Sequence, residues 1–124
     1  MKRILCILAI FALSACATAP GNSAPTPADI ANQICPSIIA VGEVLTVPGA
    51  VDPSIAADLE AAAPLVMAAC STTVQFPDLK ALHDNALPVL LKLVQLAPID
   101  PGQKASYILG ISVARAVLGP VLHP

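Results

Sequence analysis

Apolar residues recur at helical spacing through most of this chain, and this recurrence restricts what it can fold into. The clearest series are Ile55, Leu59, Ala62, Val66 and Ala69, and Leu79, Leu82, Ala86, Leu90 and Leu93. With 3.6 residues per turn, each series lies on one face of a helix. The short run from Ile38 to Val41 is also compatible with a strand, but helical pattern flanks it on both sides. The pattern therefore predicts an all-α domain.

Aspartates mark where the helices start. Asp29, Asp52, Asp78 and Asp100 each stand at or near the beginning of a helical stretch, where a carboxylate accepts free amide hydrogens. Proline directly follows Asp52 and Asp100, which is the order expected of an N-cap and the first helical residue. Breaker residues separate the stretches. We predict helices over 29–46, 53–70, 78–96 and 101–118.

Three of these stretches contain an internal proline, at Pro36, Pro64 and Pro88. An interior proline removes a hydrogen bond and clashes with the preceding turn, which costs ~3 kcal/mol unless the helix kinks. We expect a small four-helix bundle of proline-kinked helices. Hinges and a weak internal repeat are the alternative interpretations of the three prolines.

Residues 1–15 have the layout of a signal peptide. Lys2 and Arg3 form a positive start, Ile4 to Leu13 an apolar segment, and Ser14 and Ala15 the small residues that precede a cleavage site. The apolar segment is too short to span a hydrocarbon core, which takes about 20 residues in a helix. We therefore predict a leader that is removed, by cleavage between Ala15 and Cys16.

Leu13-Ser14-Ala15-Cys16 resembles the lipobox of bacterial lipoproteins. The resemblance implies that Cys16 receives a diacylglycerol thioether, becomes the new N-terminus and is then N-acylated with palmitate or a similar chain. Several acyl chains anchor a protein stably where one does not. Ala17 stands where an aspartate retains such proteins at the inner membrane, so the resemblance implies the outer membrane, with the domain facing the periplasm. The alternative is an ordinary secretory signal in which Cys16 has no role.

The segment after the lipobox differs from the rest of the chain. Residues 16–28 are rich in proline and alanine and contain no charge, so they bury too little surface to fold. We predict a disordered tether over 16–28 and a helical domain over 29–124.

Composition excludes several classes of function. Removal of the leader takes two of the six Lys and Arg residues and none of the eight Asp and Glu residues, so the mature chain is acidic and has no basic cluster for nucleic acid. Its aromatic residues are Phe76 and Tyr107, which make no platform for stacking bases or sugars. We therefore expect neither nucleic acid nor a small-molecule substrate as a partner.

The sequence offers little for catalysis. His83 and Asp84 are the only close imidazole and acid, and adjacent helix positions point about 100° apart, so we expect the two not to face each other. His123 lies in the C-terminal tail, and neither histidine has zinc-site spacing. We predict no enzyme activity, no cofactor and no metal site.

Cys35 and Cys70 are the cysteines left after lipidation. In an oxidising periplasm such a pair is more typical of a disulfide than of a metal site. The bond would contribute about 3–4 kcal/mol by closing a long loop. A straight antiparallel hairpin would leave the two cysteines ~10 Å apart along the helix axes, so kinks or a crossed pair must absorb the offset. The alternative is two buried free thiols.

The scarcity of charge between residues 30 and 75 and between 105 and 122 predicts leftover apolar surface. Such a patch would bind an envelope protein or a second copy of the chain, whereas exposed alanine-rich faces can also be harmless. The mature part resembles small prophage lipoproteins in its paired cysteines and mid-helix prolines. Phage lipoproteins of this size include superinfection-exclusion factors, so the resemblance implies a tethered protein that acts by binding or scaffolding.

The stretch from Ala105 to Leu122 supports an alternative. As a membrane span it would, with the N-terminal lipid, resemble the single-chain spanins of phage lysis. Arg115 argues against a membrane span, because inserting an arginine at the centre of a membrane helix costs ~2.5 kcal/mol or more. A fourth amphipathic helix of the bundle is the expectation.

Overall fold

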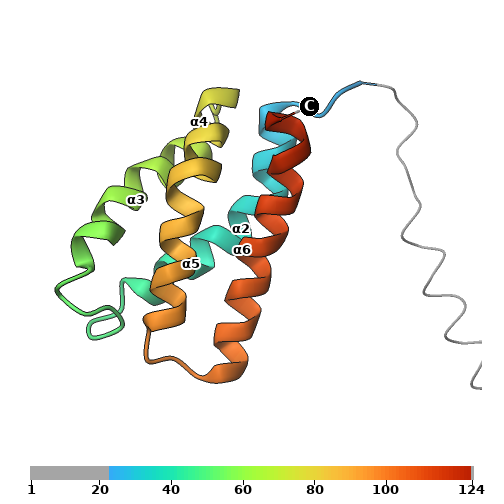
Figure 1. Cartoon of the computed structure of the whole chain (residues 1–124). Helices are drawn as coiled ribbons and strands as arrows, with labels where there is room; N and C mark the ends of the chain where they lie inside the picture. Colours follow the sequence, from blue (N-terminus) through green and yellow to red (C-terminus); the bar gives the residue numbers. More distant parts are fainter. Residues whose placement is uncertain (1–22, 124) are drawn as a thin grey trace, which may run out of the picture.

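The computed structural model of the protein describes residues 23–123, and these form an all-α bundle (Figure 1). Its elements are α2 (Pro27–Leu45), α3 (Ala56–Ala69), α4 (Phe76–Ala81), the π-helical turn η2 (Leu82–Ala86), α5 (Leu87–Leu96) and α6 (Pro101–Leu122). α4, η2 and α5 follow one another without a break and make one helical stretch. The part of the chain that the structure describes therefore has four helical stretches and no strand, which confirms the predicted all-α four-helix bundle. The predicted leader, the lipobox and tether residues 16–22 lie outside the described residues.

Asp29, Asp78 and Asp100 each accept a backbone hydrogen bond at the start of a helix, as predicted. Asp100 is the N-cap of α6, and its carboxylate accepts from the backbone N–H groups of Gly102 at 2.9 Å and Gln103 at 3.2 Å. α2 begins at Pro27, two residues inside the predicted tether, because Thr26 and Asp29 form a capping box. The Asp29 N–H donates to the Thr26 hydroxyl, and the Thr26 N–H donates to the Asp29 carboxylate.

Two helix boundaries differ from the prediction by three residues or more. α3 begins at Ala56 rather than at residue 53, because the Asp52 carboxylate accepts from the Ser54 N–H at 2.8 Å and closes a turn there. α6 continues to Leu122, past the predicted end at 118. Pro120 lies in the last turn of α6, where the His123 N–H still donates to the Gly119 carbonyl at 3.0 Å.

Two of the helical stretches that contain an internal proline are deformed, as predicted. Pro36 lies inside α2 and Pro64 inside α3. α2 changes direction between its first and second halves (Figure 1). Pro88 follows η2, in which the Leu87 N–H donates to the carbonyl of Leu82, five residues earlier. Pro88 lacks an N–H and its ring crowds the preceding turn, which accounts for a π turn at this place.

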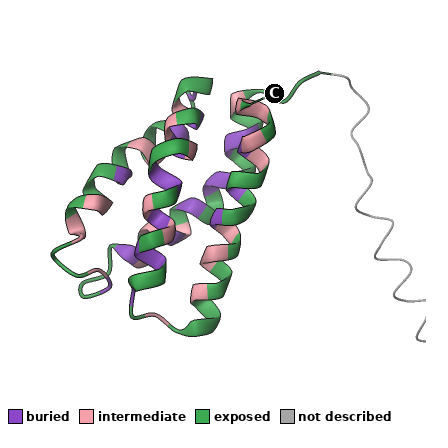
Figure 2. Cartoon of the chain, viewed as in Figure 1, coloured by how far each residue is buried: buried purple, intermediate pink, exposed green. Residues whose placement is uncertain are grey.

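The buried residues are apolar, and nearly all of them form one core cluster to which every helix contributes; Figure 2 marks buried residues in purple. None of the buried side chains in the described part of the chain is polar or charged. α6 packs mainly against α2 and α5, and a Cβ at Gly110 would lie 3.3 Å from the Ser37 Cβ, so small residues allow α2 and α6 to approach closely. The largest fully buried side chains are Ile30, Ile38, Val41, Leu45, Leu79, Leu82, Leu87, Leu90, Leu93, Val94, Ile111 and Leu118.

A disulfide joins Cys35, in the middle of α2, to Cys70, at the end of α3, with 5.7 Å between the Cα atoms. The offset between the two cysteines along the helix axes is smaller than expected for a straight hairpin. The reason is that residues 46–55, which connect α2 to α3, are not α-helical. The helical segments 35–45 and 56–70 differ by only about four residues, or ~6 Å. The bend of α2 accommodates the rest, and the disulfide is present.

Candidate functional site

The helical domain carries three surface features that bear on function: a groove between α2 and α3, an uncharged face of α6, and a polar cluster of Lys80, His83, Asp84 and His123. Of the site residues predicted from the sequence, Cys35 and Cys70 are bonded to each other. Ala15 and Cys16 lie outside the described residues, and their lipidation stays a prediction.

The groove encloses about 260 Å³ between α2 and α3. Ile39 and Met67 stand on its two sides, with 46% and 74% of their surface exposed, and Leu90 of α5 closes it from beneath. Glu43 is the one charged residue of its lining, and the Thr46 hydroxyl already donates to the Glu43 carbonyl at 2.8 Å. The complete lining is Ile39, Gly42, Glu43, Thr46, Ala63, Val66, Met67 and Leu90.

The composition of α3 explains why this groove stays open. α3 buries only Ala62 and Ala69 fully, and alanine fills little space between two helices. Val66 of α3 is therefore only partly buried against the core, and Met67 is exposed. An exposed Met is a flexible, polarisable group that adapts to different contact shapes.

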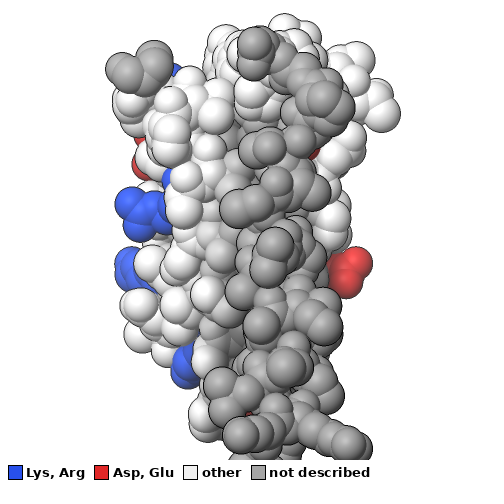
Figure 3. All heavy atoms as spheres, turned by 90° about the vertical axis from the view of Figure 1, so that its right-hand side faces the viewer, with Lys and Arg blue, Asp and Glu red and all other residues white. Residues whose placement is uncertain are grey.

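The outer face of α6 is also apolar. Leu109 is 65% exposed and Val113 51% exposed. Among the described residues, α6 alone is long and apolar enough to cross a membrane by length and composition, with a mean hydropathy of 1.6 and only 17% of that stretch buried. Where grey atoms do not cover this side of the molecule, Lys and Arg side chains lie along one edge and leave a broad area uncharged (Figure 3).

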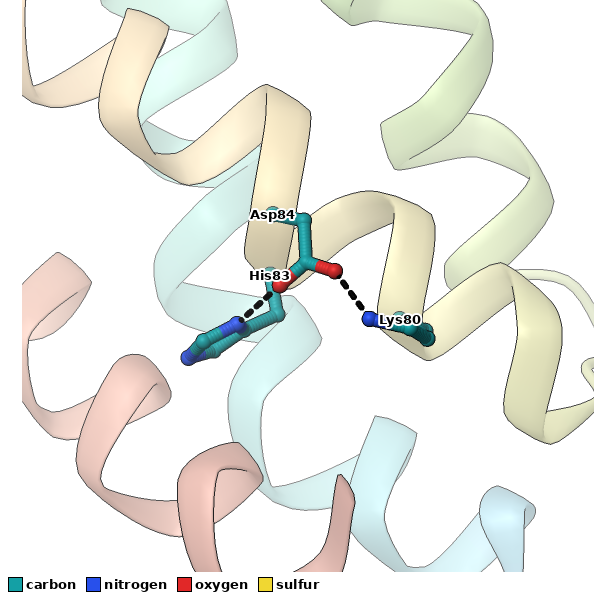
Figure 4. Close-up of polar contacts among 3 residues, drawn as sticks. All are labelled: Lys80, His83 and Asp84. Carbon is teal, nitrogen blue, oxygen red and sulfur yellow. Dashed lines mark hydrogen bonds and ion pairs between the residues drawn. The ribbon is translucent and has the colours of Figure 1, made fainter. Parts of the chain in front are cut away.

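The polar cluster centres on the carboxylate of Asp84, which lies between the His83 ring and the Lys80 ammonium group (Figure 4). The His83 Nδ1 lies 2.7 Å from Oδ1 of Asp84, and the Lys80 Nζ donates to Oδ2. The hydrogen bond from His83 and then that from Lys80 lower the pKa of Asp84 to about 2. Asp84 is therefore ionised at neutral pH.

His123 completes this cluster, because the end of α6 lies beside η2. The rings of His83 and His123 lie edge to face, with 5.9 Å between their centroids. One nitrogen from each ring and one Asp84 oxygen all lie within 4.8 Å of one another.

One sequence-based expectation about this cluster is wrong. His83 and Asp84 do contact each other, because they lie in the π turn η2 rather than in regular α-helix and the His83 ring turns back toward the carboxylate. His123 follows the last residue of α6, as expected, and lies near His83 because α6 continues to Leu122 and its end contacts η2. A spacing search misses this pair, since 40 residues separate His83 from His123 in the sequence. The sequence feature that could have drawn attention to this pair is that the chain contains just two histidines.

The comparisons with known proteins identify no relative. No protein-family model matches the chain, and neither the curated proteins nor the solved structures contain a match to it.

Proposed function

We propose that this protein is a lipid-anchored protein of the cell envelope that binds another envelope protein on the periplasmic side of the outer membrane. The α2–α3 groove is the binding surface, and it takes a large apolar side chain of the partner. The observation that carries this proposal is a groove with almost no polar lining and with Ile39 and Met67 exposed beside it. Superinfection exclusion in a phage-carrying cell is one process that such binding serves.

The size and chemistry of the groove support this function. Its 260 Å³ suit one aliphatic or aromatic side chain, and burying such a side chain contributes ~1.5–3 kcal/mol. Burial of the Met67 and Ile39 side chains adds to this term. A contact of this kind acts through complementarity of shape and needs no reacting group.

The disulfide also supports the proposal that the groove binds a partner. Cys35 and Cys70 join α2, one wall of the groove, to the end of α3, the other wall. A binding surface whose walls are held in place before contact loses less conformational entropy on binding. The covalent bond compensates for the small alanine side chains between the walls.

Site-specific photocrosslinking in cells tests the groove. We expect a photoreactive residue at position 39 or 67 to give the same covalent adduct with one envelope protein. A photoreactive residue at Ala57, an exposed position on the same helix α3 outside the groove lining, is the matched control and gives none. An adduct with a second copy of this chain would identify self-association as the contact. The absence of any adduct at 39 and 67, or the same adducts at 57, would refute the groove.

The anchor is tested separately. We expect metabolic labelling with a palmitate analogue to mark the wild-type protein and to leave Cys16→Ala unlabelled. Labelling of both proteins, or of neither, would contradict lipidation at Cys16.

A second candidate function is a phage lysis protein of the single-chain spanin type, and α6 is the observation that favours it. The helix is 22 residues long and largely exposed. Sodium carbonate extraction of the Cys16→Ala variant separates the two proposals. Release into the soluble fraction is expected for the groove-binding protein, and retention in the membrane fraction is expected for a protein with a second membrane contact.

A further inference from the structure

The cluster of His83, Asp84 and His123 has the chemistry of a metal site. Both histidines of the chain are in it, contributed by the π turn η2 and by the C-terminal end of α6. Zinc ions in proteins are bound by imidazole, thiolate and carboxylate groups, and imidazole also suits copper ions. The cluster lies apart from the α2–α3 groove, so the inference does not rest on the proposed function.

The hydrogen bond to Asp84 sets the direction in which His83 presents its free nitrogen. A carboxylate only accepts hydrogen bonds, so the His83 Nδ1 carries the proton in the 2.7 Å contact. The His83 Nε2 then keeps its lone pair available for an ion. Histidines that bind metals in proteins almost always donate their other ring N–H to a carboxylate, a carbonyl or a water in this way.

Asp84 is already committed to two partners, and this assigns its part in the site. Its second oxygen accepts from the Lys80 ammonium group, so both oxygens are in use (Figure 4). Its role is therefore to orient the His83 ring. The His83 side chain is only 17% exposed, which further restricts the ring, whereas His123 is exposed and free to adjust.

The two histidine rings lie close enough to reach one ion by a side-chain movement, with 5.9 Å between their centroids. Two nitrogens on a tetrahedral zinc ion, each at about 2.0–2.1 Å from it, lie about 3.3 Å apart. One nitrogen of the His83 ring and one of the His123 ring lie within 4.8 Å of each other here, so the two rings must approach by up to about 1.5 Å. His123 is the C-cap of α6, beyond the last helical turn, and rotation of its side chain supplies this movement.

We propose that Nε2 of His83 and the ring of His123 bind a divalent transition-metal ion, Zn²⁺ or Cu²⁺, with Asp84 as the residue that orients His83. Water completes the coordination. Copper binds such nitrogen sites more tightly than zinc, whereas Mg²⁺ prefers oxygen ligands. The ion would join η2 to the end of α6.

The binding is tested on the full-length protein purified without a polyhistidine tag. The two histidines give two sets of ring signals in an NMR spectrum, which makes the site directly visible. We expect ZnCl₂ to shift both sets together at one stoichiometric equivalent and MgCl₂ to shift neither. CuCl₂ is added in competition and should displace Zn²⁺. A shift of one histidine alone, or no shift at all, would overturn the proposal.

Variants then separate the ligands from the orienting residue. We expect His123→Ala to weaken Zn²⁺ binding by at least tenfold, and this exposed residue contributes little to folding. Asp84→Asn should weaken binding by about 10–100-fold, as the loss of a hydrogen-bond partner of a metal ligand does. Lys80→Met should strengthen it, because a positive charge leaves the neighbourhood of the ion.

Asp78→Asn is the matched control, because it removes a carboxylate from α4 outside the cluster, and it should leave Zn²⁺ affinity unchanged. Circular dichroism checks that each variant folds. Zn²⁺ affinity that survives in the His83→Ala, His123→Ala double variant would refute the site.

Discussion

α3 and α6 are held in the same bundle by different means. α3 buries only two alanines fully, and its C-terminal end is bonded to α2 through Cys70 and Cys35. α6 has no covalent link among the described residues and is held by Ile111, Ala114 and Leu118, which are at most 1% exposed. The comparison indicates that the disulfide replaces packing where the side chains are too small to supply it.

Removing the disulfide should cause the largest loss in the free energy of unfolding. We expect the Cys35→Ser, Cys70→Ser double variant to lose about 3–4 kcal/mol of unfolding free energy, because the unfolded chain is no longer restricted by a closed loop of this length. Urea denaturation of oxidised protein, of reduced protein and of the variant measures it. Equal midpoints for oxidised and reduced protein would contradict the assigned role.

Truncating the buried side chain of α6 should have the next largest effect. Leu118→Ala removes a fully buried side chain, which costs about 3 kcal/mol in the free energy of unfolding. The same denaturation series measures it, with Leu109→Ala, at an exposed position of the same helix, as the control. If the two variants lose the same free energy, α6 is not held by its buried face.

A smaller effect is expected for the buried alanines of α3. Ala62→Gly should cost about 1 kcal/mol, because glycine is unfavourable inside a helix and one methyl leaves the core. The cost should rise once the disulfide is reduced, since α3 then depends on packing alone. Thermal unfolding of the oxidised and reduced forms checks this, and an identical cost in both forms would argue that α3 does not need the disulfide.

The smallest effect concerns the start of α2. The hydrogen bonds from the Thr26 side chain and then from its backbone lower the pKa of Asp29. A carboxyl group whose pKa is lower in the folded state contributes stability above its unfolded pKa and loses it as the pH falls through the folded pKa. Thr26→Ala should therefore raise the Asp29 pKa toward its ordinary value, as measured by NMR titration of the carboxyl carbon. An unchanged pKa would show that the capping box does not persist in solution.

Much of the fold could be predicted because its causes are local. Asp100 marks the start of α6 by an N-cap that involves residues two and three positions away, and Pro36 bends the helix that contains it. The disulfide could be predicted from the cysteine count and the expected compartment, though not from helix geometry alone. Its feasibility depended on the late start of α3 at Ala56, which the turn at Asp52 determines.

The polar cluster could not be predicted, because its cause is tertiary. A π turn before Pro88 and the extension of α6 to Leu122 are both needed to bring His83 and His123 together. Neither is visible in the periodicity of the sequence, which treats every turn as 3.6 residues. The scarcity of charge predicted that some apolar surface would stay exposed. It did not predict where the groove lies, because the position of its walls depends on how α2 crosses α3.

The described chain enters and leaves the bundle at the same end. The start of α2 lies beside the C-terminal end of α6, and the connection between α2 and α3 lies at the opposite end (Figure 1). If Cys16 carries the lipid, as we propose, the anchor would be joined to the end of the domain that holds Thr26 and His123, and the α2–α3 and α5–α6 connections would lie at the end away from it.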